Sequence, residues 1–369
     1  MNVVAGERRV PGHELRALTG VRGIAAWFVV LYHIRLSIAG LPTGVRDVFA
    51  KGYLAVAFFF LLSGFVIWLT WNDRLRATRK SGRATGILRF LQKRIARIWP
   101  LHLVTLGAAV ALALVLRATG RNDPQFLFPE LPLHVLLLQN WGFTRHLAWN
   151  DPAWSISAEL AAYLVFPLLV MVVDWRRLPS VALLTIAALL LVGLHLAIDA
   201  PTLGADIPRY GLLRCLIEFT TGGIVCALWL RWRTRPGAVR YATTAVLILA
   251  TAWIVGTPET LIVPSLFAAI VLLLALTAGR AHNPLETPVI HYLGDISYAT
   301  YLGHFILWKA FKLAFVSNAA AVSPGRIALY LGLVLLASIA LYHLIERPAQ
   351  RWLNMLPSRL REGSGEGRQ

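Results

Sequence analysis

Charged residues are scarce in this chain of 369 residues: only 15% are Asp, Glu, Lys or Arg, whereas 57% are hydrophobic. Together with a mean hydropathy of +0.63, this balance excludes an ordinary soluble domain and a disordered chain. Lysine and arginine still outnumber the acids by 36 to 18. A nucleic-acid partner would need a basic face on a soluble domain, so we expect none. The composition indicates an all-α protein that crosses a membrane several times.

Sequence patterns of several other protein classes are absent. The only two cysteines, Cys215 and Cys226, lie about 16 Å apart on one expected helix, which is too far for a disulfide. No Cys or His pair has metal-ligand spacing, and the chain has neither a glycine-rich phosphate loop nor a GxSxG elbow. We therefore expect no bound metal, no nucleoside-triphosphatase site and no permanently bound cofactor.

Apolar runs long enough to cross a membrane recur along the chain. The first lacks a small-residue cleavage site after a short apolar core, so we expect it to remain as an anchor. A shorter run at 131–141 is expected to be re-entrant or interfacial. About ten crossings are expected, at 18–38, 53–71, 99–117, 153–173, 179–197, 210–230, 239–256, 261–279, 290–315 and 327–345.

Most lysines and arginines fall in alternate loops between these spans, and the largest group lies at 74–97. By the positive-inside rule, this segment and both termini are expected on the cytoplasmic side of the membrane. The expected organisation is a single transmembrane domain at 1–352 and a short polar tail at 353–369, which we expect to be disordered and cytoplasmic.

The first span contains ionisable residues, in RGIAAWFVVLYHIR at 22–35. Arg22 and His33 are 11 residues apart, about three turns plus 20°, so they share one helix face and are separated by about 16 Å. A neutral histidine can simply join two helices, yet intramembrane ionisable residues are candidates for function. Beside a hydrated cavity, His33 could act as a general base toward a hydroxyl or as a nucleophile. Arg35 is expected to be an interfacial anchor.

The basic segment 74–97 combines a turn containing glycine and serine with an amphipathic part. In the amphipathic part, Arg94 and Arg97 are three residues apart, so they occupy neighbouring positions on a helix. They could contact only anionic membrane lipid. Alternatively, two guanidiniums one turn apart could bind a phosphate group of a cytoplasmic ligand.

A carboxylate lies about one turn inside another span, in WSISAELAAY at 154–163. Ser155 and Glu159 are four residues apart and share a helix face, close to Trp154. A carboxylate near a helix start is favoured by the helix dipole and needs no further role. Glu159 could equally orient a catalytic group or accept a proton.

Two further groups of polar residues lie inside expected spans. LGDISYATYLGHFIL at 293–307 places Ser297, Tyr301 and His304 at positions i, i+4 and i+7, a stripe that predicts a polar cavity lining. Aromatic belts at the membrane interface explain tyrosines without any function. Arg214 and Glu218 are four residues apart in another span and are expected to form an internal ion pair.

Six motifs in order resemble the bacterial membrane-bound acyltransferase-3 proteins, which modify cell-surface glycans and small glycosides. LTGVRGIAAWFVVLYH at 18–33 is similar to the family's first-helix signature. The match covers about residues 15–352. The other five motifs are FFFLLSGF at 58–65, KRIARIWP at 93–100, WSISAE at 154–159, ISYATYLGH at 296–304 and IERPAQRW at 345–352.

The resemblance implies an acyl-CoA donor, usually acetyl-CoA, which enters from the cytoplasm as a co-substrate. It implies His33 as the catalytic histidine and a donor side formed by Arg22, Arg94 and Arg97, with a glycan, lipid-linked saccharide or glycoside acceptor on or near the periplasmic side. Glu159 would orient the imidazole or the acceptor. Many relatives carry an acid where this chain has Ala57, so the role of that acid cannot be transferred.

Two other classes of protein share parts of this pattern. A transporter or flippase for a glycan or glycolipid would also have about ten spans and could use intramembrane His, Glu and Arg as a proton relay. Against it, the chain lacks a matching pair of Gly/Pro-interrupted spans in its two halves. A catalytically silent scaffold in a polysaccharide-export complex is the third alternative.

Overall fold

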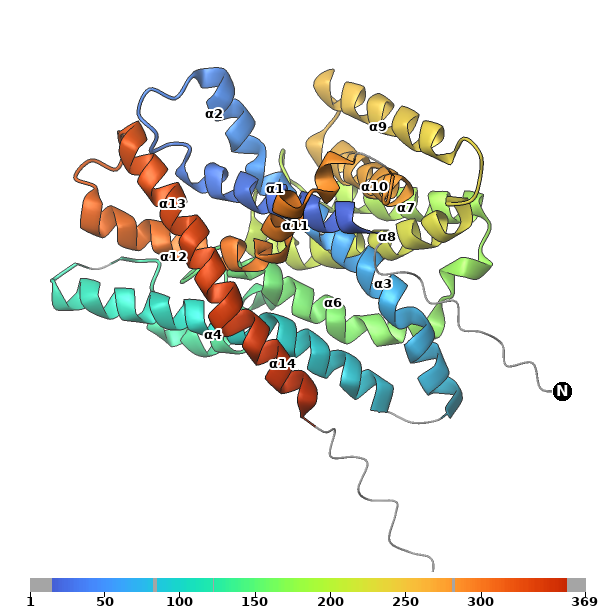
Figure 1. The fold of residues 1–369 in the computed structure, drawn as a ribbon, viewed down its shortest axis with the longest axis horizontal. Helices are drawn as coiled ribbons and strands as arrows, with labels where there is room; N and C mark the ends of the chain where they lie inside the picture. Colours follow the sequence, from blue (N-terminus) through green and yellow to red (C-terminus); the bar gives the residue numbers. More distant parts are fainter. Residues whose placement is uncertain (1–14, 82–84, 122, 281–282, 357–369) are drawn as a thin grey trace, which may run out of the picture.

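Helices make up nearly all the regular structure of this computed structural model, which describes residues 15–81, 85–121, 123–280 and 283–356 (Figure 1). These ranges contain no β-strand, only an isolated bridge between Ile38 and Val322. The longer helices are α1 (Arg16–Ile34), α3 (Ala55–Ser81), α4 (Thr85–Ala118), α6 (Ala153–Val172), α7 (Ser180–Ala197), α8 (Ile207–Trp232), α9 (Ala238–Ile254), α10 (Glu259–Thr277), α12 (Ser297–Phe315) and α13 (Pro324–Leu341).

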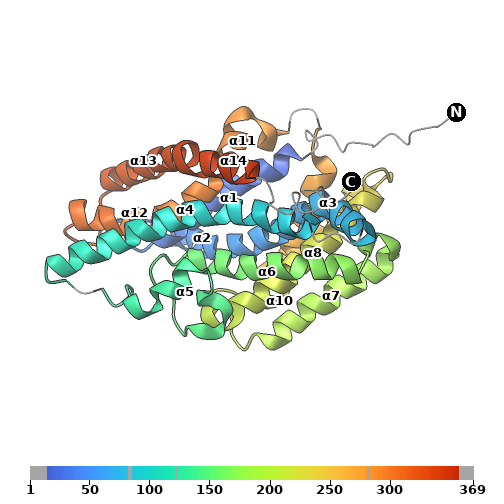
Figure 2. The ribbon, with the colours of Figure 1, turned by 90° about the horizontal axis from the view of Figure 1, so that it is seen from below.

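Shorter elements connect these helices. The short α-helices are α2 (Thr43–Ala50), α5 (Leu131–Val135), α11 (Pro288–Asp295) and α14 (Arg347–Met355). Single turns of 3₁₀ or π helix are η1 (Lys51–Leu54), η2 (Phe128–Glu130), η3 (Gln139–Phe143), η4 (Trp175–Arg177), η5 (Pro284–Glu286) and η6 (Tyr342–Glu346). Figure 2 shows α13 and α14 along one edge of the bundle and α7 and α10 along the other, with α1, α3, α4 and α6 between them.

The prediction of an all-α membrane protein is confirmed. Within the described ranges, eight helices are long and apolar enough to cross a membrane. Helix α9 is apolar but has only 17 residues, and α12 is not among the eight. Each of the ten expected spans corresponds to helix, while the number of crossings and the cytoplasmic side of the termini stay predictions.

Three segments differ from the expected pattern. The span expected at 290–315 is divided between α11 and α12. The turn expected at the start of 74–97 is shorter than predicted, because α3 continues to Ser81 and α4 begins at Thr85. At the C-terminus, α14 continues past the expected domain end at residue 352, and positions 357–369 of the expected tail lie outside the described residues.

Glycines set the close contact between α3 and α8, which is the most extensive helix pairing in the described part of the chain. A Cβ on Gly64 would overlap the carbonyl oxygen of Phe219, and a Cβ on Gly222 would overlap that of Leu61. Small residues at such crossings allow two backbones to touch, which is a common basis of helix association in membranes. The crossing therefore lies near residues 61–64 of α3 and 219–222 of α8.

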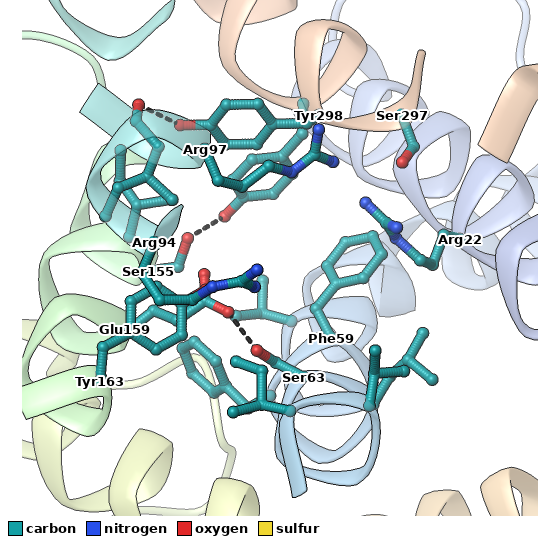
Figure 3. A pocket seen from close by; sticks show the side chains of 18 residues that line it. Arg22, Phe59, Ser63, Arg94, Arg97, Ser155, Glu159, Tyr163, Ser297 and Tyr298 are labelled. Atoms are coloured by element: carbon teal, nitrogen blue, oxygen red, sulfur yellow. Dashed lines mark hydrogen bonds between the residues drawn. The ribbon is translucent and has the colours of Figure 1, made fainter. Parts of the chain in front are cut away.

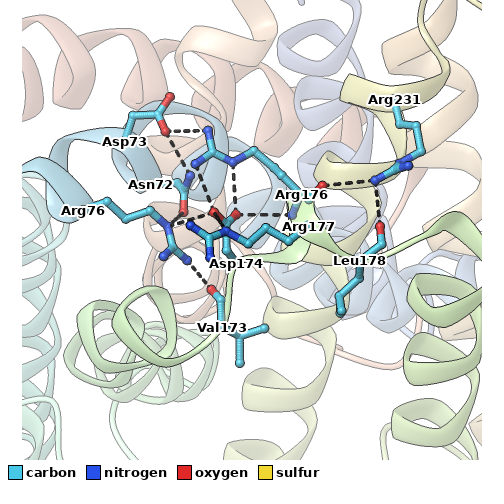
Figure 4. A network of polar contacts seen from close by, with 9 residues as sticks. All are labelled: Asn72, Asp73, Arg76, Val173, Asp174, Arg176, Arg177, Leu178 and Arg231. Atoms are coloured by element: carbon cyan, nitrogen blue, oxygen red, sulfur yellow. Dashed lines mark hydrogen bonds and ion pairs between the residues drawn. The ribbon is translucent and has the colours of Figure 1, made fainter.

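A polar network joins the ends of α3, α6 and α8 (Figure 4). Arg176 of η4 bonds Asp73 of α3 at 2.6 Å and Asp174 at 3.1 Å. Arg231 near the end of α8 donates to the carbonyl of Arg176 at 3.0 Å. Burial alone would raise the pKa of Asp174, but the hydrogen bond and charge of Arg176, with Arg76, hold it below its usual value. Because the C-terminal ends of α3 and α8 meet here, the two helices run parallel.

Helix α1 is placed by a second set of glycine contacts. A Cβ on Gly23 would overlap the backbone at Leu293 and Gly294, and one on Gly294 would overlap the carbonyl oxygen of Thr19. This contact holds α1 against α11, and α12 continues along α1 beyond it. The arrangement brings the polar stripes of α1 and α12 together.

The α3–α8 crossing predicts a large effect of a single methyl group. Gly222→Ala should lower the thermal unfolding midpoint of the detergent-solubilised protein, because overpacking of a close contact costs about 1–3 kcal/mol. Gly107→Ala in α4 is the matched control, since no heavy atom lies within 4 Å of a Cβ at that helical position. Equal midpoints for the two variants would contradict the proposed tight crossing.

Candidate functional site

A cavity of about 170 Å³ lies between α1, α3, α4, α6 and α12 (Figure 3). We call it the first cavity. It gathers several residues that were predicted separately from distant parts of the sequence. Its polar and aromatic lining consists of Arg22, Phe59, Phe60, Ser63, Arg94, Arg97, Ser155, Glu159, Tyr163, Ser297, Tyr298 and Tyr301.

Three guanidinium groups point into the first cavity from two helices (Figure 3). Arg97 forms an ion pair with the buried Glu346, and its guanidinium carbon lies 5.2 Å from the centre of the Tyr298 ring. Arg94 lies over the Tyr163 ring at 5.9 Å.

Arg22 and Arg94 have no hydrogen-bond or ion-pair partner within the described residues. An unpaired cation between membrane helices is energetically costly, so the first cavity is suited to an anionic ligand group.

Glu159 lies in the first cavity and not beside His33. Its carboxylate accepts a hydrogen bond from the hydroxyl of Ser63 on α3. Ser155, one turn earlier on α6, is 2.8 Å from the hydroxyl of Tyr301. The orienting role expected for Glu159 toward the imidazole therefore has no direct contact to support it.

A second cavity of about 250 Å³ lies next to the first. Val56 and Tyr301 line both cavities, so these two side chains form the partition between them. The Tyr301 hydroxyl also lies 3.1 Å from the carbonyl of Pro152, which holds its ring in place. The remaining polar and aromatic lining of the second cavity is Tyr32, His33, Arg35, Tyr53, Asp151, Trp154 and Arg214.

His33 is held by two contacts to the same ring nitrogen. Its Nδ1 lies 2.9 Å from the carbonyl oxygen of Val29 and 3.1 Å from Nε2 of His304. Nδ1 of His304 lies 3.0 Å from the carbonyl of Thr300. Because a carbonyl oxygen can only accept, this network assigns the proton of each neutral ring to Nδ1. Nε2 of His33 is then left with a free lone pair at the second cavity.

His304 has a different position from the one expected. It was predicted to line a cavity, but it lines neither of the two and is almost fully buried. Its Nε2 instead accepts from His33, and the hydroxyl of Tyr330 donates to its backbone carbonyl at 2.9 Å. His304 therefore fixes the orientation of the His33 ring from behind.

The other predicted residues divide between the two cavities. Ser155 and Ser297 line the first, and the Ser297 hydroxyl donates to the carbonyl of Gly294 at 2.7 Å. Trp154 lines the second. Arg35 also lines the second cavity, with its guanidinium 4.0 Å from the centre of the Tyr32 ring. Its anchoring role at the membrane interface stays a prediction.

Sequence reasoning missed four residues that the structure places at these sites: Ser63, Tyr298, Glu346 and Asp151. Three of them lie inside motifs already noted, since Ser63 belongs to FFFLLSGF, Tyr298 to ISYATYLGH and Glu346 to IERPAQRW. No local pattern indicates that Glu346 pairs with Arg97. Many relatives carry an acid at the position of Ala57. This alanine is fully buried, whereas the neighbouring Val56 lines both cavities.

The expected internal ion pair of Arg214 and Glu218 is confirmed, with 3.8 Å between Nε and Oε1. Cys215 and Cys226 are both free and buried, as their spacing predicts. Among the residues that the structure describes, no group of three or more His, Cys, Asp or Glu side chains is placed to hold a metal ion.

Comparison with known proteins confirms the resemblance seen in the motifs. Residues 15–343 match the family model described as Acyltransferase domain. Acyltransferase MdmB of Streptomyces mycarofaciens is 31% identical and aligns over 92% of this chain and 92% of its own. Exopolysaccharide production protein ExoZ of Rhizobium meliloti is 30% identical over 82% of this chain and 91% of its own. Putative membrane-bound transacylase BcsY of Komagataeibacter xylinus is 26% identical, over 94% and 86%. No solved structure matches the chain.

Asp151 predicts a pH-dependent stability. Burial raises its pKa to about 6, although a hydrogen bond from Gln125 and the charge of Lys309 oppose the shift. The pKa of an unfolded aspartate is about 3.9, so the folded protein binds more protons between these values and loses stability as pH rises through them. Asparagine has no titrating carboxyl group, so Asp151→Asn should not lose stability in this pH range.

The variant should therefore exceed the wild type in thermal midpoint at about pH 7.5, with a smaller gap at about pH 4.5. Asp47→Asn, at an exposed position of α2, is the control and should show no such trend. A gap between Asp151→Asn and wild type that does not change with pH would contradict the prediction.

Proposed function

We propose that this chain, which belongs to the acyltransferase-3 family of membrane proteins, transfers an acyl group from acyl-CoA to a hydroxyl of a glycan, lipid-linked saccharide or glycoside. The acyl group would be acetyl and the product an O-acyl ester. The observation that carries the proposal is that an arginine-lined cavity and a histidine-lined cavity meet at Tyr301 and Val56. One cavity would bind the donor and the other the acceptor.

The donor would bind through the first cavity, from the side expected to be cytoplasmic. Phosphate oxygens suit the planar, permanently charged guanidiniums of Arg22, Arg94 and Arg97. The pantetheine arm would extend toward the partition, because Arg22 and His33 are about 16 Å apart along α1. Binding of this arm would hold the thioester close to the reacting hydroxyl.

His33 would carry the chemical step. Its free Nε2 could take the proton of an acceptor hydroxyl as a general base. The same lone pair could instead attack the thioester and form a short-lived acyl-imidazole. His304 would act as a positioning residue in both routes, because its bond to Nδ1 keeps Nε2 unprotonated.

The acceptor would enter the second cavity from the side expected to be periplasmic. Tyr32, Tyr53 and Trp154 offer ring faces with polar edges, which suit the mixed surface of a sugar. The relative ExoZ is named for exopolysaccharide production. An exopolysaccharide unit on its lipid carrier is therefore the acceptor we propose to test first. The expected location is the bacterial inner membrane.

Replacement of the histidine tests the enzyme directly. His33→Ala should abolish transfer of radiolabel from acetyl-CoA to glycan in membrane vesicles of the source organism, while CoA binding remains. His195→Ala is the matched control, because His195 lies on α7 and lines neither cavity. Full transfer by His33→Ala would remove His33 from the mechanism. Movement of glycan across the membrane without acyl transfer would support the flippase alternative.

The unpaired arginines test donor recognition. Arg22→Gln and Arg94→Gln should raise the KM for acetyl-CoA with little change in kcat, because they remove binding that is equal in ground and transition states. Arg89→Gln is the control, at an exposed position of α4 outside the first cavity. Unchanged KM values would assign Arg22 and Arg94 to contacts with anionic lipid.

A further inference from the structure

Arg214 is the most deeply buried cation at the second cavity. It lies on α8 with 2% of its surface exposed, yet it belongs to the lining of the cavity that contains His33. Its Nη1 donates to the carbonyl of Leu203, and its guanidinium carbon lies 5.7 Å from the centre of the Trp154 ring. Neither the motifs nor the proposed donor and acceptor contacts give this side chain a role.

One edge of the guanidinium has no hydrogen-bond acceptor. Nε and Nη2 of Arg214, and both carboxylate oxygens of Glu218, are buried without a hydrogen-bond partner among the described residues. Glu218 balances the charge, but its Oε1 is 3.8 Å from Nε, which is too long for a hydrogen bond. Buried N–H donors are rarely left unpaired in proteins. The Arg214–Glu218 pair is therefore incompletely hydrogen-bonded beside the second cavity, and its guanidinium can bind a further acceptor.

The register of α3 and α8 places Arg214 at the partition. The two helices run parallel and cross where Leu61 and Gly64 of α3 meet Gly222 and Phe219 of α8. On α8, Arg214 lies about two turns before the midpoint between Phe219 and Gly222. On α3, Val56 lies the same number of residues before the midpoint between Leu61 and Gly64. Each offset is about 10 Å along the helix axis. Arg214 is therefore level with Val56, where the acyl group would pass from one cavity to the other.

We propose that the Nε–Nη2 edge of Arg214 stabilises the oxyanion that forms on the acyl carbonyl during transfer, an inference that rests on the proposed function. In the first step, Nε2 of His33 takes the hydroxyl proton, the acceptor oxygen bonds to the carbonyl carbon, and the C=O π electrons move to the carbonyl oxygen. In the second, that oxyanion re-forms the double bond and the C–S bond breaks. The thiolate of CoA takes the proton from His33, which leaves the ester and free CoA.

Paired substitutions separate this role from a purely structural one. Removing only Arg214 would leave Glu218 buried and unpaired, which is strongly destabilising. The test variant is therefore Arg214→Gln/Glu218→Gln, which removes both charges, and Arg214→Lys alone is the matched variant that keeps both charges but lacks the Nε–Nη2 edge. Each is compared with wild type and His33→Ala for the elution profile in detergent, the Kd for CoA and the rate of acetyl transfer in source-organism vesicles.

The double variant should elute as wild type and bind CoA with an unchanged Kd, but transfer acetyl about 10²- to 10³-fold more slowly, as expected for loss of an oxyanion-hole donor. Arg214→Lys should also elute as wild type, because it keeps the ion pair with Glu218, but it should transfer acetyl more slowly, because an ammonium lacks the two-donor edge. This variant keeps the test decisive if the double variant folds poorly.

Two results would overturn the inference and leave the proposed function intact: a double variant with the wild-type rate, or a loss of rate matched by an equal loss of CoA affinity. Equal rates for wild type and His33→Ala would overturn the proposed function, and the role of Arg214 with it.

Discussion

The backbone contact between α3 and α8 fixes the geometry on which both cavities depend. Gly64 and Gly222 bring the two helices so close that no side chain fits between them, and this sets the register of α8 against α3. As a result, Val56 and Arg214 lie at the same depth. Helix α6 packs against α8 and supplies Trp154, Ser155 and Glu159. A looser crossing would move the side chains that line the two cavities apart, even if none of those residues were replaced.

The ionisable side chains inside the bundle differ in how many of their polar atoms have a hydrogen-bond or ion-pair partner. Arg97 has Glu346, and His33 has His304. Arg22 and Arg94 lack such partners within the described residues, and Arg214 keeps one free edge. Because hydrocarbon offers no hydrogen bonds, each incomplete group has an energetic cost. Arg22, Arg94 and Arg214 each line one of the two cavities, which is where a ligand could complete them.

The helices and the main candidate residues could be predicted from sequence, because apolar runs and helical periodicity are local signals. Arg22 and His33 were placed on one face by spacing alone. Contacts between distant segments carry no such signal: the pairs Arg97–Glu346 and His33–His304 join positions 249 and 271 residues apart. The break between α11 and α12 was missed, although Gly294 and Asp295 lie next to it. Helical spacing also could not show that α6 presents the Glu159 carboxylate to Ser63 of α3.

The partition of Tyr301 and Val56 has a consequence for the membrane itself. A protein that joins substrates from two compartments through one continuous channel would also conduct ions and dissipate the proton gradient. In the proposed function, a partition of one tyrosine and one valine would avoid this, because the nucleotide and the sugar would each stay on their own side. Only a group as small as an acyl unit would have to pass the barrier, so the bilayer would remain electrically sealed.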